Sequence, residues 1–318
     1  MSKLDELIRE LCPDGVEYKR LEECCTLVKG KTPIQKAEPG EYPLVVTTSE
    51  RRTCSTYQFD KPTVCIPLIS SRGHGVASLN SVYYQEGKFA LGNILCGVTP
   101  NDEDYLSAKF LFEYLNYKKD TLLVPLMKGG ANVSMTVDSL KRVSVPVPPM
   151  QVQSEIVGIL NGFTNLLMEL TAELTARKTQ YAYYRDNLLT TKPQWNHVKI
   201  LDMLSQPITD GPHTTPQFVQ NGVPFISVDS IWDGKIHFEK RRGYITEEFD
   251  EECCKKYRPQ KNDVYMVKSG STTGKVAFVD TDIRFNIWSP LAAMRVNEKN
   301  SARFLFYLLQ TERVQKQV

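Results

Sequence analysis

Short apolar runs, separated by loops that contain glycine, proline and polar residues, make up most of this chain of 318 residues. Runs rich in β-branched and aromatic residues, such as 42–46 and 223–227, predict strands. Apolar residues three and four apart predict short helices over 110–115 and 304–309. The alternation of these elements predicts an α/β fold, in the broad sense that includes α+β.

The same landmarks occur twice in the same order, which indicates a long and divergent internal repeat. Each copy contains an opening segment, a first strand, a strand followed by a glycine turn and another strand, an apolar run and a short helix. The matched segments are 17–21 with 195–201, 42–46 with 223–227, 69–77 with 267–277, 89–98 with 285–296, and 110–115 with 304–309. The two halves are therefore predicted to be homologous domains that share one fold.

A long helix is predicted between the two halves. Pro146-Val147-Pro148-Pro149 stops the strand before it, and Lys192-Pro193 ends it. Its side chains spaced alternately by four and three residues form a heptad pattern, here called the seam: Ile156, Leu160, Phe163, Leu167, Leu170, Leu174, Arg177, Tyr181, Tyr184 and Leu188. The pattern favours a coiled-coil spacer on the order of 60 Å long that needs a partner helix. An amphipathic helix packed on its own domain is the alternative. The predicted domains are thus 1–145, 146–192 and 193–318.

Composition and charge indicate an ordinary globular protein. Hydrophobic residues make up 41% and charged residues 24% of the chain, and the formal net charge is +2, which excludes a disordered or collagen-like chain. No apolar run approaches the roughly 18 residues of a membrane span, and charges at Lys3, Asp5, Glu6 and Arg9 occupy the segment where a secretory signal would be apolar. We therefore expect a cytoplasmic protein without membrane contact, whose eight cysteines are reduced and buried.

No group of residues has the pattern of a catalytic, metal or cofactor site. The segment 270–276 resembles a phosphate-binding loop, but three residues rather than four separate its glycines and Val276 replaces the Mg²⁺-binding hydroxyl, so a β-hairpin turn is favoured. The adjacent pairs Cys24-Cys25 and Cys253-Cys254 lack zinc-ligand spacing. A turn capped by its own histidine explains the segment 210–216 as well as a catalytic role does. We predict no catalytic residue, no metal and no cofactor.

Nucleic-acid binding has support from local groups of basic residues, although the charge of the whole chain does not favour it. Such groups, mixed with small polar residues in loops, can place guanidinium groups on guanine edges and ammonium groups on phosphates. The candidate DNA-binding residues are Lys29, Lys31, Arg51, Arg52, Arg72, His74, Lys240, Arg241, Arg242, Lys268, Ser269 and Lys275. For any one of these groups, an ordinary solvated surface is the alternative.

The long helix carries the most specific motif of the chain. It opens with Pro146-Val147-Pro148-Pro149-Met150 and ends in the aromatic and basic cluster Tyr183-Tyr184-Arg185. With one domain copy on each side of this helix, the chain resembles the DNA-specificity subunit of Type I restriction-modification systems over nearly all of its length. The segment 11–18 resembles the domain opening of that family. The segment 211–216 resembles a loop common in its recognition domains, which adds His213 and Thr214 to the candidate DNA-binding residues.

The resemblance implies a subunit that is not an enzyme. Each globular half would be a target recognition domain that reads one part of a split site on double-stranded DNA. The helix would set the spacing and dock the modification (methyltransferase) subunits, in a complex that also contains a restriction (translocase/nuclease) subunit. The second half stops at Val318 without counterparts of 128–132, of 146–149 and of a second seam helix, so we expect the chain to lack a C-terminal portion. The unpaired seam is then expected to self-associate, or to need a modification subunit for solubility.

Two other interpretations stay open at this point. The chain could be the DNA-recognition part of a Type II restriction-modification enzyme whose catalytic domain lies outside these residues. It could also be a coiled-coil adaptor with no role on DNA. DNA binding that weakens steeply with salt is expected for phosphate contacts, and an adaptor would show none.

Overall fold

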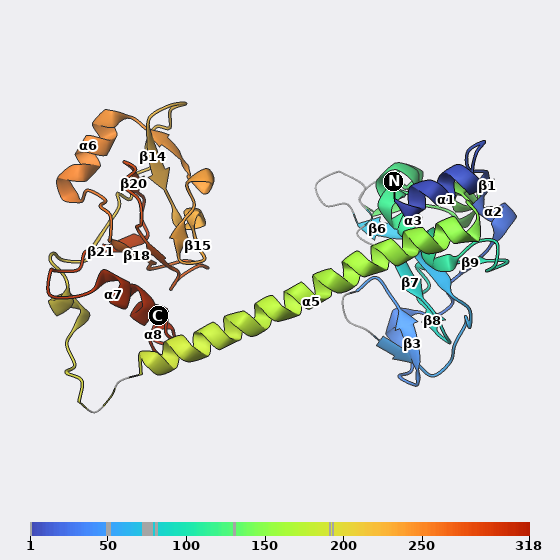
Figure 1. Ribbon diagram of the computed structural model, residues 1–318, viewed down its shortest axis with the longest axis horizontal. Coiled ribbons are helices and arrows are strands. Elements are labelled where there is room, and N and C mark those ends of the chain that lie inside the picture. The colour runs from blue at the N-terminus through green and yellow to red at the C-terminus, as the bar shows by residue number, and fades with distance from the viewer. Residues whose placement is uncertain are drawn as a thin grey trace. The chain divides into compact units, whose positions relative to one another are not determined.

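The structure of the chain is a computed structural model that describes residues 2–48, 52–71, 79, 82–129, 132–190, 192 and 194–318. It divides into two compact units, Met1–Leu170 and Thr171–Val318 (Figure 1). Each unit mixes helices with strands, which confirms the predicted fold class.

Two sheets form the body of the first unit. Its strands are β1 (Tyr18–Arg20), β2 (Cys25–Lys29), β3 (Tyr42–Val45), β4 (Arg52–Cys54), β5 (Thr63–Pro67), β6 (Ile69–Ser71), β7 (Tyr83–Gln85), β8 (Ala90–Leu91), β9 (Leu95–Pro100), β10 (Lys128–Gly129), β11 (Asn132–Ser134) and β12 (Ser144–Pro146). The larger sheet has the order β2-β9-β5-β7 with all neighbours antiparallel. The second has the order β4-β3-β8, in which β3 and β8 run parallel. Two smaller sheets, β1-β12 and β10-β11-β6, complete the unit.

The main core of the first unit lies between the larger sheet and a helix. The helices are α1 (Lys3–Leu11), α2 (Leu21–Cys24), α3 (Ala108–Leu122) and α4 (Val137–Lys141), with 3₁₀ turns at Ile34–Lys36 and Val124–Leu126. Ile66 of β5 and Val98 of β9 share a core with Leu111 and Leu115 of α3. Helix α3 extends beyond the predicted 110–115 because the residues that follow contain no helix breaker.

The second unit repeats this arrangement. Its strands are β13 (Thr209–Asp210), β14 (Val223–Ile226), β15 (Ile231–Trp232), β16 (Lys235–Ile236), β17 (Gly243–Ile245), β18 (Val264–Val267), β19 (Val276–Phe278), β20 (Asn286–Ile287) and β21 (Leu291–Met294). Its helices are α6 (Glu247–Lys256), α7 (Ala302–Leu309) and α8 (Glu312–Gln315), with 3₁₀ turns at Ile200–Met203, Val228–Ser230 and Phe238–Lys240. One sheet has the order β13-β21-β18-β19 and another the order β17-β14-β20.

Identical strand order in the two units confirms the predicted repeat. The order β2-β9-β5-β7 corresponds to β13-β21-β18-β19, and β4-β3-β8 corresponds to β17-β14-β20, each with one parallel pair. The match extends to the helix caps, because Ser107 Oγ accepts a hydrogen bond from the N–H of Phe110 and Ser301 Oγ accepts one from the N–H of Phe304. One predicted match, 69–77 with 267–277, is wrong at its first strand, because β5 rather than β6 occupies the sheet position of β18 and β6 pairs with β11 instead. The strand expected at 76–77 lies outside the described residues, and β7 occupies the sheet position that corresponds to β19.

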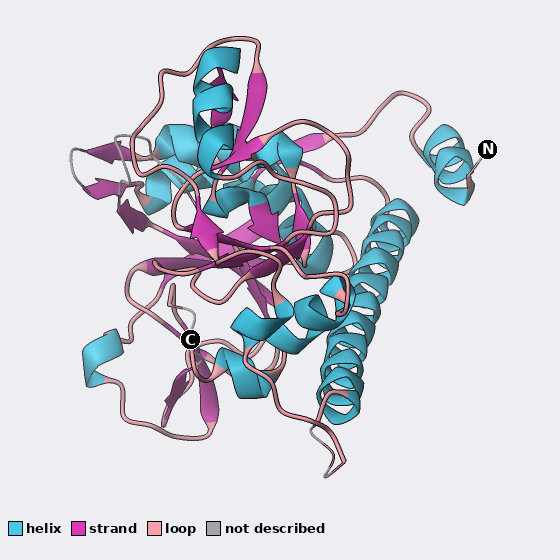
Figure 2. Ribbon diagram, turned by 90° about the vertical axis from the view of Figure 1, so that its left-hand side faces the viewer, coloured by secondary structure: helices cyan, strands magenta, loops and turns pink. Residues whose placement is uncertain are grey.

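The predicted long helix is α5 (Met150–Leu188), a single uninterrupted helix of 39 residues (Figure 2). It begins directly after Pro149, as the sequence predicts. Gln153 ties its first turn to the first unit, since its Nε2 donates to the carbonyl of Tyr105 at 2.9 Å and its Oε1 accepts from the N–H of Ser107 at 2.9 Å. Helix α1 lies beside these turns, where the side chain of Lys3 pairs with that of Glu155.

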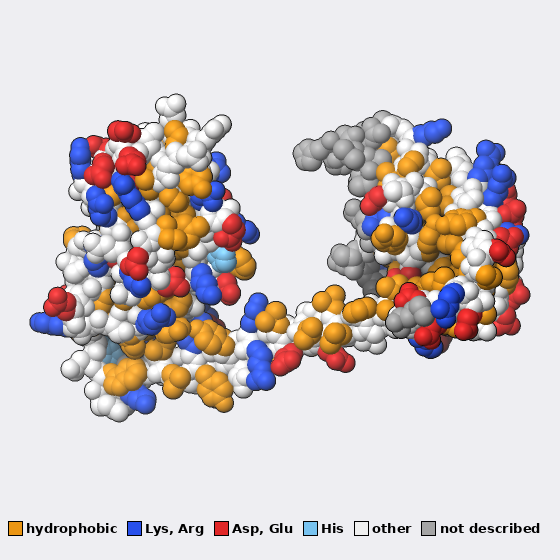
Figure 3. Space-filling view, turned by 45° about the horizontal axis from the view of Figure 1, so that its top comes forward, with side chains coloured by type: hydrophobic (Ala, Val, Ile, Leu, Met, Phe, Trp, Pro, Cys, Tyr) orange, Lys and Arg blue, Asp and Glu red, His pale blue; other side chains and the backbone are white. Residues whose placement is uncertain are grey.

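Most of the seam on α5 faces solvent. Every residue from 158 to 181 is exposed, and the exposed fractions of Phe163, Leu170 and Leu174 are 67%, 55% and 55%. Figure 3 shows hydrophobic side chains along this part of the helix. Ile156, near the start, packs against the core of the first unit. In the part of the chain that the structure describes, no helix is both long enough and apolar enough to cross a membrane.

Two glycines in the exposed part of α5 should weaken it. A Cβ atom at Gly158 or Gly162 would meet nothing within 4 Å. Changing either to alanine should therefore stabilise the helix by about 0.5–1 kcal/mol, because glycine loses more backbone entropy on folding. Slower amide hydrogen exchange in α5 measures this. As a control, Gly97→Ala in β9 should destabilise the first unit, since its Cβ would lie 2.6 Å from the ring of Phe59. Unchanged exchange in both helix variants would contradict the prediction.

Candidate nucleic-acid interface

A tight loop follows strand β2 in the first unit. A Cβ atom at Gly30 would lie 2.1 Å from the carbonyl oxygen of Gly92, so only glycine fits there. The N–H of Gly30 donates to the carbonyl of Leu95 at 2.9 Å, which attaches the loop to β9 through main-chain atoms. Two exposed candidate residues, Lys29 and Lys31, flank this glycine. Their backbone is therefore fixed while their side chains face solvent.

Neighbouring side chains hold this loop further. The amide of Gln58 accepts from the N–H of Lys31 at 3.0 Å and donates to the carbonyl of Lys29 at 2.9 Å. Arg52 on β4 donates from Nη1 to the carbonyl of Ile34, just beyond the loop, at 3.3 Å. The structure thus brings Lys29, Lys31 and Arg52 to one region of the first unit. The other candidates of this unit, Arg51, Arg72 and His74, lie outside the described residues.

The second unit has the same kind of loop after strand β13. A Cβ atom at Gly211 would lie 2.0 Å from the carbonyl oxygen of Ile287, the last residue of β20. A Cβ atom at Gly30 would lie 2.7 Å from the carbonyl of Leu91, the last residue of the corresponding β8. Gly30 and Gly211 are therefore equivalent, and we call them the anchor glycines. Both glycines lie outside the matched segments of the sequence repeat, although a Thr-Pro pair follows each one, at 32–33 and 215–216.

Asp210, next to the second anchor glycine, collects several polar side chains. Its carboxylate accepts from Lys256 Nζ at 2.8 Å and from Lys268 Nζ, and it lies 3.3 Å from His213 Nε2 and 3.5 Å from Ser289 Oγ. We call these five residues the Asp210 cluster. Burial acts to raise the pKa of the Asp210 carboxyl, but the hydrogen bonds and charges of the two lysines outweigh it and lower the pKa to about 2. The cluster joins the predicted residues His213 and Lys268 and adds Lys256 and Ser289.

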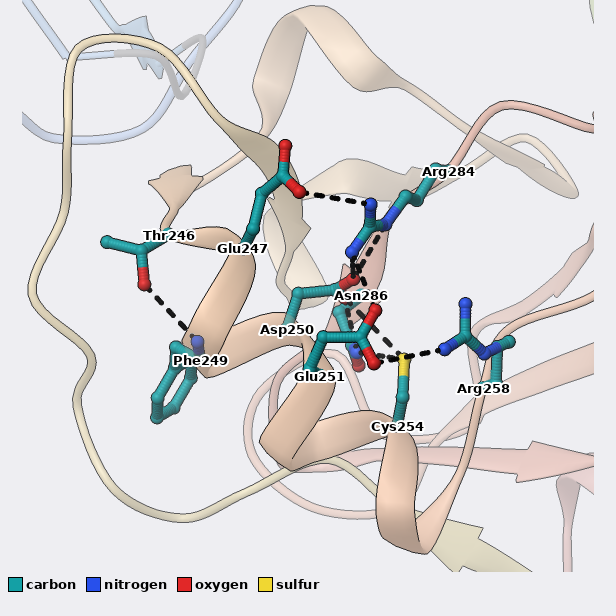
Figure 4. A network of polar contacts seen from close by, with 9 residues as sticks. All are labelled: Thr246, Glu247, Phe249, Asp250, Glu251, Cys254, Arg258, Arg284 and Asn286. Carbon is teal, nitrogen blue, oxygen red and sulfur yellow. Dashed lines mark hydrogen bonds and ion pairs between the residues drawn. The ribbon is translucent and has the colours of Figure 1, made fainter.

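A second network fixes the helix that supplies Lys256, the last residue of α6 (Figure 4). Asp250 is fully buried and accepts from Arg284 Nε at 2.8 Å and from Asn286 Nδ2 at 2.9 Å. Because Asn286 begins β20, the network holds α6 beside the strand whose end meets the anchor glycine. Thr214 lines a cavity together with Lys256 and Asn286 next to the Asp210 cluster.

The glycine turn 268–275 joins β18 to β19 as an antiparallel hairpin, as predicted. Gly270 has φ +97° and Gly274 has φ +88°, a backbone region that favours glycine. The candidate side chains Lys268, Ser269 and Lys275 are exposed on it. Lys268 pairs with Asp210, the residue before Gly211. One end of this turn therefore lies beside the loop that contains the anchor glycine, which we call the anchored loop of the second unit.

The basic run 240–242 lies on aromatic rings. The cations and rings are Lys240 over Trp232 at 5.2 Å, Arg241 over Tyr244 at 4.2 Å and Arg242 over Trp288 at 5.6 Å. Trp288 directly follows Ile287, which meets the anchor glycine, so the described contacts connect Arg242 with the anchored loop. A ring beneath a guanidinium group orients it and leaves its N–H donors at the edge available.

These groups can bind a ligand through hydrogen-bond donors, most of which are positively charged. Ammonium, guanidinium, imidazole and hydroxyl groups gather on loops whose main chain is fixed. Among the described residues, no group of three or more His, Cys, Asp or Glu side chains is arranged to hold a metal ion. Such donors suit an anionic ligand with hydrogen-bond acceptors, which is the description of a nucleic-acid duplex.

Comparisons with known proteins give concordant results. The family model described as "Type I restriction modification DNA specificity domain" matches residues 13–177. A protein of Haemophilus influenzae named as a type I restriction enzyme specificity subunit is 27% identical over 83% of this chain and 68% of its own length. The EcoR124I/EcoR124II specificity subunit of Escherichia coli is 34% identical over 51% of this chain, which spans 42% of that protein. The crystal structure of a Type I S subunit from M. genitalium shares the fold, with a TM-score of 0.58 at 14% identity over 95% of this chain and 79% of that one.

Proposed function

The chain belongs to the family of Type I restriction modification DNA specificity domains, and from that membership we propose that it provides DNA sequence specificity and carries out no catalysis itself. In this proposal the domains 1–145 and 193–318 each read one part of a split site on double-stranded DNA. The helical segment 146–192 sets the spacing between the parts. It also docks the modification (methyltransferase) subunits, in a complex that also contains a restriction (translocase/nuclease) subunit. The cytoplasm, the compartment expected from the sequence, is where this role would be carried out.

The observation that carries the proposal is the repeated anchored loop. Both units have the same strand order, and both place an anchor glycine with cationic neighbours at the same edge of the larger sheet. Lys29 and Lys31 flank the first anchor glycine, and Lys268 and Arg242 lie next to the second. Two donor surfaces, each beside an equivalent glycine, support a protein that binds two stretches of the same anionic polymer.

Lys268 provides the test of this surface. Its ammonium group is exposed, and contact with a phosphate would release about one counterion. Lys268→Ala should weaken binding to duplexes of random sequence, and it should reduce the slope of log K against log salt concentration by about 1. Titration of the full chain with labelled duplexes of random sequence, over a series of salt concentrations, measures both quantities.

Lys261→Ala is the matched control for this titration. Lys261 precedes the opposite end of strand β18, and it pairs with Asp282 on the surface at 2.9 Å. Its removal should leave the salt slope unchanged. A wild-type chain that shows no salt-dependent binding would contradict the DNA role and favour an adaptor. Equal slopes for wild type and Lys268→Ala would show that the glycine turn is not part of the interface.

A further inference from the structure

The C-terminal end of the glycine turn 268–275 is attached to helix α8. The side-chain Nε2 of Gln315, the last residue of α8, donates to the carbonyl of Gly274 at 2.8 Å and to the carbonyl of Leu309 at 2.7 Å. Gly274 permits this approach, because a Cβ atom there would lie 2.5 Å from Gln315 Oε1. One side-chain amide therefore attaches the turn to the helix.

The other end of α8 is attached to the long helix α5. Thr311 precedes α8 but makes no side-chain capping hydrogen bond. Asp186 of α5 takes that role, since its Oδ2 accepts from the N–H of Glu312 at 3.0 Å. Arg185 Nε donates to the other carboxylate oxygen, Oδ1, at 2.7 Å. Burial opposes ionisation of Asp186, but the hydrogen bonds from Arg185 and Glu312 prevail and lower its pKa.

The contact of Asp186 with Glu312 and the contact of Gln315 with Gly274 together connect α5 to the glycine turn through α8. Helix α8 has four residues, about one turn, so its first N–H and the side chain of Gln315 cannot move independently. At its other end the turn is held by the ion pair of Lys268 with Asp210. The exposed side chains between these attachments, including Ser269, are therefore presented from a backbone that is fixed on both sides.

We infer that Asp186 and Gln315 are positioning residues for DNA recognition by the second unit. Through α8 they hold the glycine turn in the place where its side chains meet base edges of double-stranded DNA. The inference rests on the proposed function, in which this turn faces DNA. Hydrogen bonds to base edges tolerate little misplacement, whereas phosphate contacts depend mainly on charge. Loss of the attachment should therefore reduce sequence preference more than overall affinity.

Four variants separate this role from general effects. Gln315→Glu keeps the size of the side chain but cannot donate to the two carbonyls. Gln317→Glu introduces the same charge change at an exposed position two residues later and controls for repulsion by DNA. Asp186→Ala removes the acceptor for the N–H of Glu312. Asp186→Asn keeps an acceptor oxygen at that place and should rescue the effect.

Two measurements on the full chain provide the readout. In the first, the chain selects from a pool of random-sequence DNA duplexes, and the bound fraction is sequenced. We expect the wild type to enrich a two-part sequence, and Gln315→Glu and Asp186→Ala to lose about tenfold of the preference at one part only. In the second, hydrogen exchange without DNA should be faster over 268–275 in these two variants. Gln317→Glu and Asp186→Asn should match the wild type in both measurements.

The outcomes distinguish this inference from the proposed function. If the wild type enriches a two-part sequence and Gln315→Glu and Asp186→Ala enrich it equally well, the positioning role is overturned and the proposed function stands. The same conclusion follows if the preference falls equally at both parts. If the wild type enriches no sequence, the proposed function is contradicted, and the positioning role falls with it. Should Gln315→Glu fail to fold, Asp186→Ala with its rescue by Asp186→Asn decides the question.

Discussion

At micromolar concentration the purified chain should sediment as a dimer or a larger oligomer. Eight side chains of the seam are exposed: Leu160, Phe163, Leu167, Leu170, Leu174, Tyr181, Tyr184 and Leu188. Full burial of a large apolar side chain contributes about 1.5–3 kcal/mol, so full burial of this set in two copies would contribute about 24–48 kcal/mol. This exceeds the roughly 4–15 kcal/mol that association costs in lost freedom. A second copy of α5 offers the same heptad pattern as a partner. Sedimentation velocity over a series of concentrations measures the result.

A pair of double variants assigns this association to the seam. Leu170→Asp with Leu174→Asp should shift the chain to a monomer, because four carboxylates would be buried in each dimer. Ala172→Asp with Ala176→Asp adds the same charge at the same spacing, about 200° around the helix from the first pair, and should leave the oligomer intact. A wild-type monomer that neither double variant changes would mean that the seam needs no partner. The spacer interpretation would then be wrong.

Replacing Arg295 by methionine should destabilise the second unit by about 3–5 kcal/mol, the usual cost of removing one partner from a buried ion pair. Asp263 is fully buried, and Arg295 donates to both of its carboxylate oxygens at 2.8 Å. Tyr257 also donates its hydroxyl to this carboxylate at 2.5 Å. Methionine keeps most of the volume of arginine but leaves the carboxylate without a counter-charge.

Urea unfolding followed by tryptophan fluorescence measures this loss in the correct unit. All three tryptophans of the chain, Trp195, Trp232 and Trp288, belong to the second unit, so their emission reports on that unit. Lys261→Met is the control, because the pair of Lys261 with Asp282 is exposed and should contribute about 0–1 kcal/mol. Equal midpoints for the two variants would show that Asp263 does not depend on its ion pair.

Local patterns were sufficient to predict much of the fold. The internal repeat, the helix that begins after Pro149 and the hairpin around Gly270 and Gly274 all follow from residues that are close in the sequence, and the structure has each of them. The strand order could not be predicted, because it depends on pairings between distant segments. Strand β3, for example, pairs in parallel with β8, and residue-level propensities carry no information on that choice.

The sequence identifies candidate donors by residue type, but it gives no information on their arrangement. Nothing local in the sequence indicates that Asp210 pairs with Lys256 and Lys268, which lie far away in the chain. The anchor glycines cannot be recognised from local sequence for the same reason. Position 211 needs glycine because a Cβ atom there would lie 2.0 Å from the carbonyl oxygen of Ile287. These two residues come together only in the folded sheet.

Attachment through main-chain atoms leaves the side chains of the anchored loops free to vary. The N–H of Gly30 donates to the carbonyl of Leu95, and the N–H of Ser289 donates to the carbonyl of Pro212. Neither hydrogen bond depends on which side chain stands at the neighbouring positions. Under the proposed function, single codon changes in these loops would therefore give a lineage new DNA targets without refolding the domain. The two anchor glycines should stay unchanged while their neighbours vary, because any other residue there would displace the loop together with its cations.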